Sequence, residues 1–361
     1  MLNDSTSPAS ASTPPLLLEA WRQLRRDEPT LRIRDMAERL GVSEGELVAS
    51  RCGDGVTRLE GPWPDLIRTL PELGHVMALT RNDSCVHEKR GSYGNIEIES
   101  VMGLVLNEAI DLRLFLRHWV FGFAVREESH GRWLQSLQFF DRDGCAVHKV
   151  YLTERSDADA WSRLVARFTA AVQSPLLEIA PVKERLPLQL DDEAVDAASL
   201  REHWRRLRDP HDFFAMLKKH KVTRTQALRV AGPEFARRVR QGSVRVVLES
   251  AAASGLPVMV FVGSPGVVQI HSGPVRNLKA MGPWFNVLDE DFDLHLREDH
   301  VAESWVVSKP TPEGHVTSLE LYDARGGQIM QVFGKRKPGV PELEAWRVLA
   351  EGLPALEDGD A

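Results

Sequence analysis

Apolar residues along the first half of the chain change from a helical to a strand-like spacing. From about Pro15 to Ala49 they recur every three or four residues, which predicts helices. Between His75 and Leu152 short apolar runs end at Gly, Asn and Asp, which predicts strands, and the Asp-Gly at Asp143 predicts a hairpin turn. A closing helix is expected from about Asp157 to Gln173.

The second half repeats this order of elements. The same patterns predict helices within residues 197–240, strands from Val244 to Phe333 and a closing helix from Glu342 to Gly352. Consecutive strands joined by short turns are expected to be antiparallel, with the helices grouped beside them. The sequence therefore predicts an α+β fold.

The two series are copies of one domain. A shift of 182 positions places Val76-Met77 on Val258-Met259 and Ser136-Leu137 on Ser318-Leu319. This period is far longer than the roughly 20–50 residues of solenoid repeats, so it indicates a tandem duplication of a whole domain. A duplicated domain is expected to carry its functional cleft between the two halves.

The repeat also sets the expected domain boundaries. Residues 1–15 are predicted to be a disordered tail, 16–175 the N-terminal repeat, 176–198 a proline-containing linker and 199–355 the C-terminal repeat.

Composition restricts the expected cellular compartment and the classes of partner molecule. The chain has 361 residues, 43% apolar content and a formal net charge of −7, which suits a globular protein and disfavours broad attraction to nucleic acid. It lacks a run of about 18 apolar residues and a secretory signal, so no membrane insertion is expected. Three cysteines without metal-type spacing, Cys52, Cys85 and Cys145, favour a reducing cytoplasm.

The densest group of candidate functional residues surrounds His211. Asp209 is expected to cap a helix that has Pro210 at its first position, which leaves His211 in the first turn beside Phe214. An ordinary surface histidine at a helix start has the same local sequence.

Separated cations form the rest of the candidate site. Thr223 is expected to cap a helix whose N-terminus, together with Arg224, is a receptor for a carboxylate or phosphate. Lys309 and Arg336 follow β-prone runs, and Phe333 is a large apolar neighbour. Solvated arginines and edge-protecting lysines are the alternatives. In combination these residues suit a flat apolar ligand that bears carboxylates.

Two arginines of the first half are further candidates. Over Asp111 to Val125 a strand is expected, with Leu112, Leu114 and Leu116 on its core face. Arg113 and Arg117 then share the opposite face.

Other familiar motifs are absent from the sequence. It contains no P-loop, GxGxxG, HExxH, CxxC or GxSxG. Residues 35–51 have the spacing of a helix-turn-helix with Gly41 in the turn, but the second helix of this segment is acidic.

Several blocks of the sequence resemble the bacterial cytoplasmic haem-utilisation, or hemin-degrading, factors. They are the His-Asp-Phe-Phe from His211, the Lys-Val-Thr-Arg-Thr-Gln-Ala from Lys221, the long block from Gly282 to Val307 and the Phe-Gly-Lys-Arg-Lys-Pro-Gly from Phe333. The resemblance covers residues 16–355. It implies a large twisted antiparallel sheet with helices in each half and haem (iron protoporphyrin IX) bound in the cleft.

The resemblance also assigns roles. It implies His211 as the proximal iron ligand, Arg113 or Arg117 as the distal catalytic arginine, and Arg224, Lys309, Phe333 and Arg336 as haem contacts. The implied function is oxidative haem degradation with O₂ and a reductant, releasing iron. The alternatives are a haem chaperone that serves a separate haem oxygenase and, less favoured, a haem-responsive DNA-binding regulator. A haem importer is an implied partner.

Overall fold

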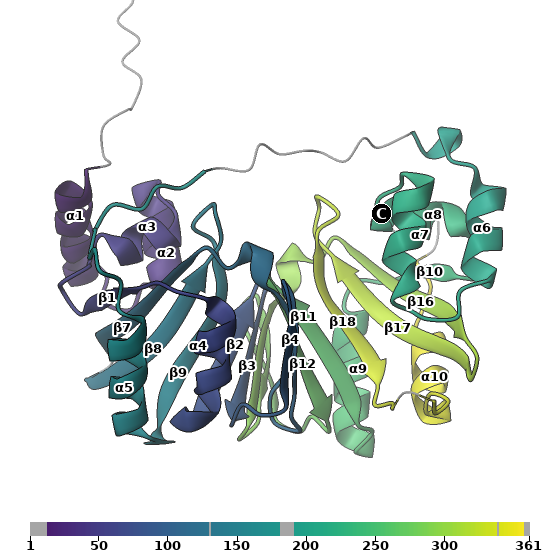
Figure 1. Ribbon diagram of the computed structural model, residues 1–361. Coiled ribbons are helices and arrows are strands. Elements are labelled where there is room, and N and C mark those ends of the chain that lie inside the picture. Colours follow the sequence, from purple (N-terminus) through teal and green to yellow (C-terminus); the bar gives the residue numbers. More distant parts are fainter. Residues whose placement is uncertain (1–12, 130, 181–190, 338, 357–361) are drawn as a thin grey trace, which may run out of the picture.

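The computed structural model describes residues 13–129, 131–180, 191–337 and 339–356 as two antiparallel sheets with helices around them (Figure 1). Each sheet has nine strands. The predicted α+β class and the duplication are confirmed. Residues 1–12 of the predicted tail and 181–190 of the predicted linker lie outside the described residues.

Sheet A takes most of its strands from the first half of the chain. In spatial order these are β1 (Val56–Leu59), β7 (Phe121–Ser129), β8 (Arg132–Phe140), β9 (Ala146–Ser156), β2 (Gly74–Arg81), β3 (Cys85–Gly91), β15 (Phe292–Arg297), β14 (Trp284–Leu288) and β13 (Leu278–Met281). The last three come from the second half.

Sheet B has the reciprocal composition. Its order is β10 (Ala236–Val239), β16 (Glu303–Thr311), β17 (Gly314–Tyr322), β18 (Gln328–Gly334), β11 (Val258–Gly263), β12 (Val267–Gly273), β6 (Asp111–Phe115), β5 (Met102–Leu106) and β4 (Ile96–Glu99). Each repeat therefore gives three strands to the sheet of the other, an exchange that the sequence did not predict.

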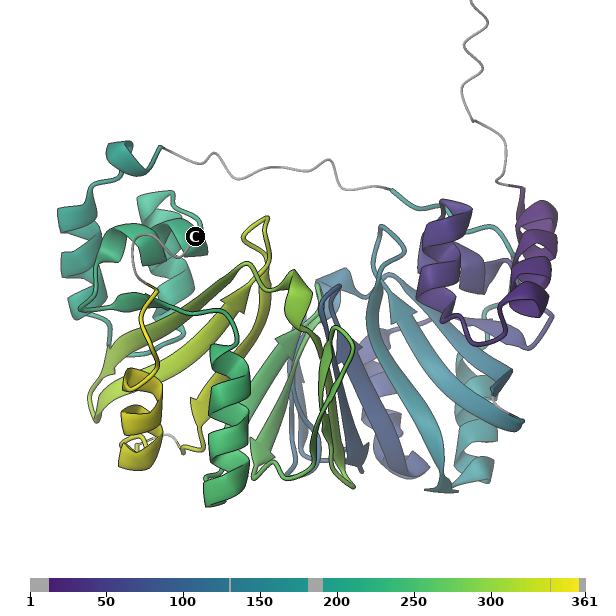
Figure 2. The same ribbon diagram turned by 180° about the vertical axis from the view of Figure 1, so that it is seen from behind.

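Helices form two groups at the ends of the molecule and cover the sheets (Figures 1 and 2). The first half has α1 (Pro14–Asp27), α2 (Ile33–Leu40), α3 (Glu44–Ala49), α4 (Trp63–Thr69) and α5 (Ala158–Phe168). The second half has α6 (Ala197–Arg205), α7 (Asp212–His220), α8 (Arg224–Ala231), α9 (Ser243–Ser254) and α10 (Glu344–Glu351). Short 3₁₀ turns lie at Leu70–Leu73, Leu116–His118, Asp192–Ala194 and Glu298–His300.

The inner faces of the two sheets meet at their central strands. Gln269 of sheet B donates to the carbonyl of Ala78 at 2.9 Å, and Thr80 of sheet A donates to Gln269 at 2.8 Å. Helices α4 and α5 pack on the inner face of sheet A, and α9 and α10 on that of sheet B. The opposite, outer faces receive the groups α1–α3 and α6–α8.

Two predicted elements of the second half are wrong. The segment from Glu234 to Arg240, predicted as a helix, contains strand β10 because it pairs with β16. The segment after Val244, predicted as a strand, is helix α9, whose buried Val244, Val247, Leu248 and Ala251 follow a helical period.

No described helix is long and apolar enough to cross a membrane.

Candidate functional site

The predicted site residues gather on the outer face of sheet B. Antiparallel partners share a face, and the register links Trp305, Glu320, Gln331, Phe261, Ile270 and Asp111 into one row across six strands. Lys309 and Phe333 share this face, as does Arg113, which pairs with Val268. The sequence predicted that these residues lie between two separate halves. They lie instead on one sheet, to which the first half contributes strands β4, β5 and β6.

Helices α6–α8 cover the β16–β17 end of this face. Phe213 of α7 and Trp204 of α6 are buried and stack edge to face, with ring centroids 4.7 Å apart. The Trp204 indole N–H also donates to the carbonyl of Ser308 in β16 at 3.0 Å. These contacts hold the helix that carries the predicted histidine against the sheet.

A cavity of about 380 Å³ opens over β11, β12 and β18. Phe261, Gly263, Val268 and Gln331 line it from sheet B, and Asn82 lines it from the turn between β2 and β3. Phe261 and Phe333 meet edge to face, with centroids 5.0 Å apart. This part of the face is therefore hollowed and partly aromatic.

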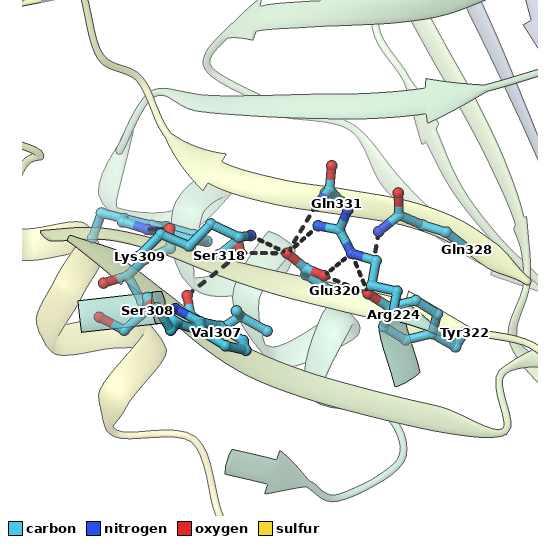
Figure 3. A network of polar contacts seen from close by, with 12 residues as sticks. Arg224, Val307, Ser308, Lys309, Ser318, Glu320, Tyr322, Gln328 and Gln331 are labelled. Atoms are coloured by element: carbon cyan, nitrogen blue, oxygen red, sulfur yellow. Dashed lines mark hydrogen bonds and ion pairs between the residues drawn. The ribbon is translucent and has the colours of Figure 1, made fainter. Parts of the chain in front are cut away.

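A buried carboxylate, Glu320, organises the polar part of the face (Figure 3). Arg224 donates to it through Nε at 2.9 Å and Nη2 at 2.8 Å, and Lys309 Nζ donates at 2.8 Å. Ser318, Gln331 and Tyr322 donate to the same carboxylate. Glu320 is not among the residues predicted from the sequence, yet it pairs with two of them, Arg224 and Lys309.

Burial and charge shift the pKa values in this cluster. Burial lowers the pKa of Lys309 to about 8, and Arg224 adds to this effect while Glu320 opposes it. Burial by itself would raise the pKa of Glu320, but Arg224 and Lys309 hold it well below its usual range. The carboxylate thus stays ionised between two cations, and the cluster carries one net positive charge while Lys309 is protonated.

The cluster also supports helix α7. The Arg224 guanidinium carbon lies 5.1 Å from the ring centroid of Phe213, and Lys309 Nζ lies 4.7 Å from the same centroid. Cations at these distances attract the face of an aromatic ring. Phe213 therefore connects the cluster to the turn that carries His211, two residues earlier.

His211 lies on an exposed turn before α7. The predicted helix start at Pro210 is wrong by two residues, because α7 begins at Asp212 and His211 is its N-cap. Asp209 does not cap the helix; its Oδ1 instead accepts from the His211 backbone N–H at 2.8 Å and contacts ring Nδ1 at 2.6 Å. The His211 side chain is 87% exposed.

Arg336 lies close enough to this turn to act on it electrostatically. Hydrogen bonds from His211 and the positive charge of Arg336 lower the pKa of Asp209. The structure thus brings His211 and Arg336 to one end of the face that carries Phe333.

The two predicted distal arginines lie in different elements. Arg113 is in β6 on the outer face of sheet B, where its guanidinium pairs with Asp111. Arg117 lies in the 3₁₀ turn that follows, is exposed and donates to His118 at 3.0 Å. The prediction that both share one strand face is wrong, because the strand ends at Phe115.

Within the described ranges, no three histidine, cysteine, aspartate or glutamate side chains converge as metal ligands.

Known proteins resemble this chain in sequence and in fold. The model of the haemin-degrading HemS/ChuX domain matches residues 41–168 and 221–353, one match in each repeat. The chain belongs to this haemin-degrading family. The hemin transport protein HemS of Yersinia enterocolitica is 41% identical over 334 residues, covering 92% of this chain and 95% of that protein.

Solved structures of family members have the same fold. The heme-binding protein PhuS of Pseudomonas aeruginosa, in its holo form, is 50% identical with a TM-score of 0.93, covering 96% of this chain and all of that one. The heme degrading enzyme ChuS of Escherichia coli O157:H7 is 36% identical with a TM-score of 0.89, covering 95% of this chain and 100% of its own.

Proposed function

We propose that this protein binds haem on the outer face of sheet B, in the cytoplasm, and degrades it with O₂ and a reductant to release iron. The observation that carries the proposal is the exposed imidazole of His211 beside a hollowed, partly aromatic sheet face that bears separated cations. Its relatives are named as hemin transport, heme-binding and heme degrading proteins, which supports the same ligand.

The residues on this face fit haem. A single imidazole suits an axial position on haem iron, whose remaining in-plane ligands come from the porphyrin. Phe333 and Phe261 offer apolar surface to the macrocycle. Arg336 supplies a forked donor for a propionate. Arg224 binds Glu320 through Nε and Nη2, and its side chain is 28% exposed, which leaves Nη1 for a second propionate. Lys309 is 4% exposed, so we assign it the support of Arg224 and Glu320 as well as the predicted contact.

Arg113 is our choice for the distal residue. It shares the sheet face with Phe261 and Phe333, whereas Arg117 lies beyond the end of the strand. Bound haem supplies the oxygen and redox chemistry, and the chain supplies orientation and polarity. In this role Arg113 would supply N–H donors to a bound oxygen species.

The second candidate function is a haem chaperone that delivers intact haem from an importer to a separate haem oxygenase. The exposure of His211 favours it, because a partner protein can reach an exposed ligand. The regulator hypothesis loses support, because Glu44, Leu47, Val48 and Ala49 of the candidate DNA-reading helix are buried against the protein.

Haem binding is tested by titrating the protein with hemin and following the Soret band. We expect saturation at one haem per chain and a large loss of affinity in His211→Ala. His315→Ala removes another exposed histidine and should bind as the wild type does. An unchanged band and affinity in His211→Ala would contradict the proposed site.

Degradation is tested by adding ascorbate to the complex in the presence of catalase, which removes free peroxide. Loss of the Soret band with formation of a linear tetrapyrrole and free iron supports the enzyme. A persistent Soret band supports the chaperone.

A further inference from the structure

We propose that Asp209 is a positioning residue that fixes the orientation of His211 and increases its electron donation to iron. The inference rests on the proposed haem function and deepens it. It concerns the side of the imidazole that faces away from the ligand.

The hydrogen-bond geometry sets the form of the imidazole. Asp209 Oδ1 lies 2.6 Å from His211 Nδ1 and also accepts the His211 backbone N–H at 2.8 Å. An ionised carboxylate can only accept hydrogen bonds, so Nδ1 carries the proton. The lone pair of the ring then lies on Nε2, which is the nitrogen left to bind a metal.

The chain holds this pair on one short, rigid turn. Pro210 fixes the backbone between the two residues, and the Asp212 N–H donates to the carbonyl of Asp209 at 3.0 Å. The next residues anchor the turn, because Phe213 and Met216 of α7 are buried. The carboxylate and the ring therefore keep their relative positions before any ligand arrives.

The pair adds little to the stability of the fold. The side chains of His211 and Asp209 are 87% and 56% exposed, and exposed ion pairs contribute about 0–1 kcal/mol. When a ligand covers the ring and removes water, a hydrogen bond to a charged acceptor becomes stronger. The hydrogen bond between Asp209 and His211 is therefore expected to affect a bound ligand more than the stability of the fold.

The chemical effect follows from the charge of the carboxylate. A metal-bound imidazole whose other N–H donates to a carboxylate is a more basic ligand. A more basic axial ligand stabilises Fe(III) relative to Fe(II), and axial ligation is one of the levers that set haem reactivity. We therefore assign Asp209 the tuning of the iron, while His211 alone makes the bond.

Asp209→Asn tests this role, because asparagine keeps a side-chain oxygen as acceptor but removes the charge. We expect the variant to bind haem and to shift the Fe(III)/Fe(II) equilibrium about tenfold toward Fe(II), which is about 59 mV for one electron. The iron–histidine stretching frequency of the ferrous complex should fall. Asp212→Asn makes the same charge change on the other side of His211 and should leave both readouts near the wild-type values.

The outcomes separate this inference from the proposed function. If the wild-type protein forms no Soret band with hemin, the haem site itself is wrong. If Asp209→Asn binds haem with an unchanged potential and stretching frequency, the haem site stands and the role of Asp209 is overturned. A shift of equal size in Asp212→Asn would also overturn it, because the effect would then be general electrostatics.

Discussion

The outer faces of sheets A and B carry different charges at equivalent positions. Arg224 is the first residue of α8, and Glu44 is the first residue of α3, the equivalent helix of the first half. Glu320 of β17 corresponds to Gln138 of β8 under the shift of 182 positions. In the second half the acid, Glu320, is therefore on the strand and the arginine is at the start of the helix. In the first half the acid, Glu44, is at the start of the helix and an amide, Gln138, is on the strand.

The same comparison explains why one face is hollow. Gly263 and Gln331 line the cavity on sheet B, and their equivalents on sheet A are Arg81 and Lys149. Both of these cations bind the buried Glu44. Where sheet B leaves room for a ligand, sheet A uses long side chains to complete an internal ion cluster.

The residues that precede equivalent helices, one above each face, also differ between the two halves. His211 precedes α7, and Arg32 precedes the equivalent helix α2. Arg32 lies over the Trp284 ring of sheet A, with its guanidinium carbon 5.6 Å from the centroid. The two halves therefore share a fold and a group of helices, and their differences in charge and side-chain size leave one face hollowed and the other filled.

The largest expected effect comes from Glu320→Gln. This variant leaves the buried Lys309 and the half-buried Arg224 without their counter-charge, and breaking a buried ion pair in this way typically destabilises by about 3–5 kcal/mol. Urea unfolding followed by circular dichroism measures the loss.

Gln138→Leu is the matched change on sheet A. Gln138 is buried; its side-chain oxygen has no hydrogen-bond partner among the described residues, and its amide N–H donates to Ser136 Oγ at 3.0 Å. We therefore expect a change of less than about 1 kcal/mol, because an apolar replacement there loses little. Similar losses in the two variants would contradict the contrast between the two faces.

The sequence predicted the duplication because equivalent apolar residues keep their register over the repeat. It did not predict the strand exchange, because β6 and β15 have the same apolar face whichever sheet they join. Only the packing of whole sheets, with β12 beside β6 and β3 beside β15, selects the partner.

Some residues of the candidate site carry local signals in the sequence, but the network that joins them does not. His211 and Arg336 carry local signals, a turn beside aromatic residues and a basic strand end. Glu320 alternates with Leu319 and Leu321 and so resembles a solvent-facing strand residue. Its partner Arg224 is 96 positions away in the sequence, and only the tertiary structure brings the two together.

A second prediction concerns pH and the first half. Burial and the carboxylate of Asp293, directly opposite on β15, raise the pKa of Glu88 to about 7. Ile270 stands at the equivalent position of sheet B. Because the folded-state pKa of Glu88 is raised, its contribution is complete below about pH 4.5 and is lost as the pH rises through 7.

We therefore expect Glu88→Gln to flatten the loss of stability between pH 5 and 8, with a gain of about 3 kcal/mol at pH 8. Denaturant unfolding at several pH values measures this profile. Glu313→Gln changes an exposed carboxylate and should leave the profile as it is. If the unfolding free energy of Glu88→Gln depended on pH as that of the wild type does, Glu88 would ionise in the folded protein without loss of stability.

A smaller effect than that of Glu320→Gln is expected where exposed cations link α2 to sheet A. Arg34 Nη2 lies 3.1 Å from Asp83 Oδ1, with side chains 34% and 81% exposed, and Arg32 stacks over Trp284. Exposed ion pairs and cation–π contacts each contribute about 1 kcal/mol or less. We expect the double variant Arg32→Ala, Arg34→Ala to lose at most about 2 kcal/mol in urea unfolding, with part of the loss absent in 1 M salt because salt screens exposed charges.

Hemin titration of this variant should give the wild-type affinity and stoichiometry, since these residues lie on the outer face of sheet A. A second bound haem in this variant would mean that two exposed arginines, rather than the buried Glu44 cluster, keep the first face closed.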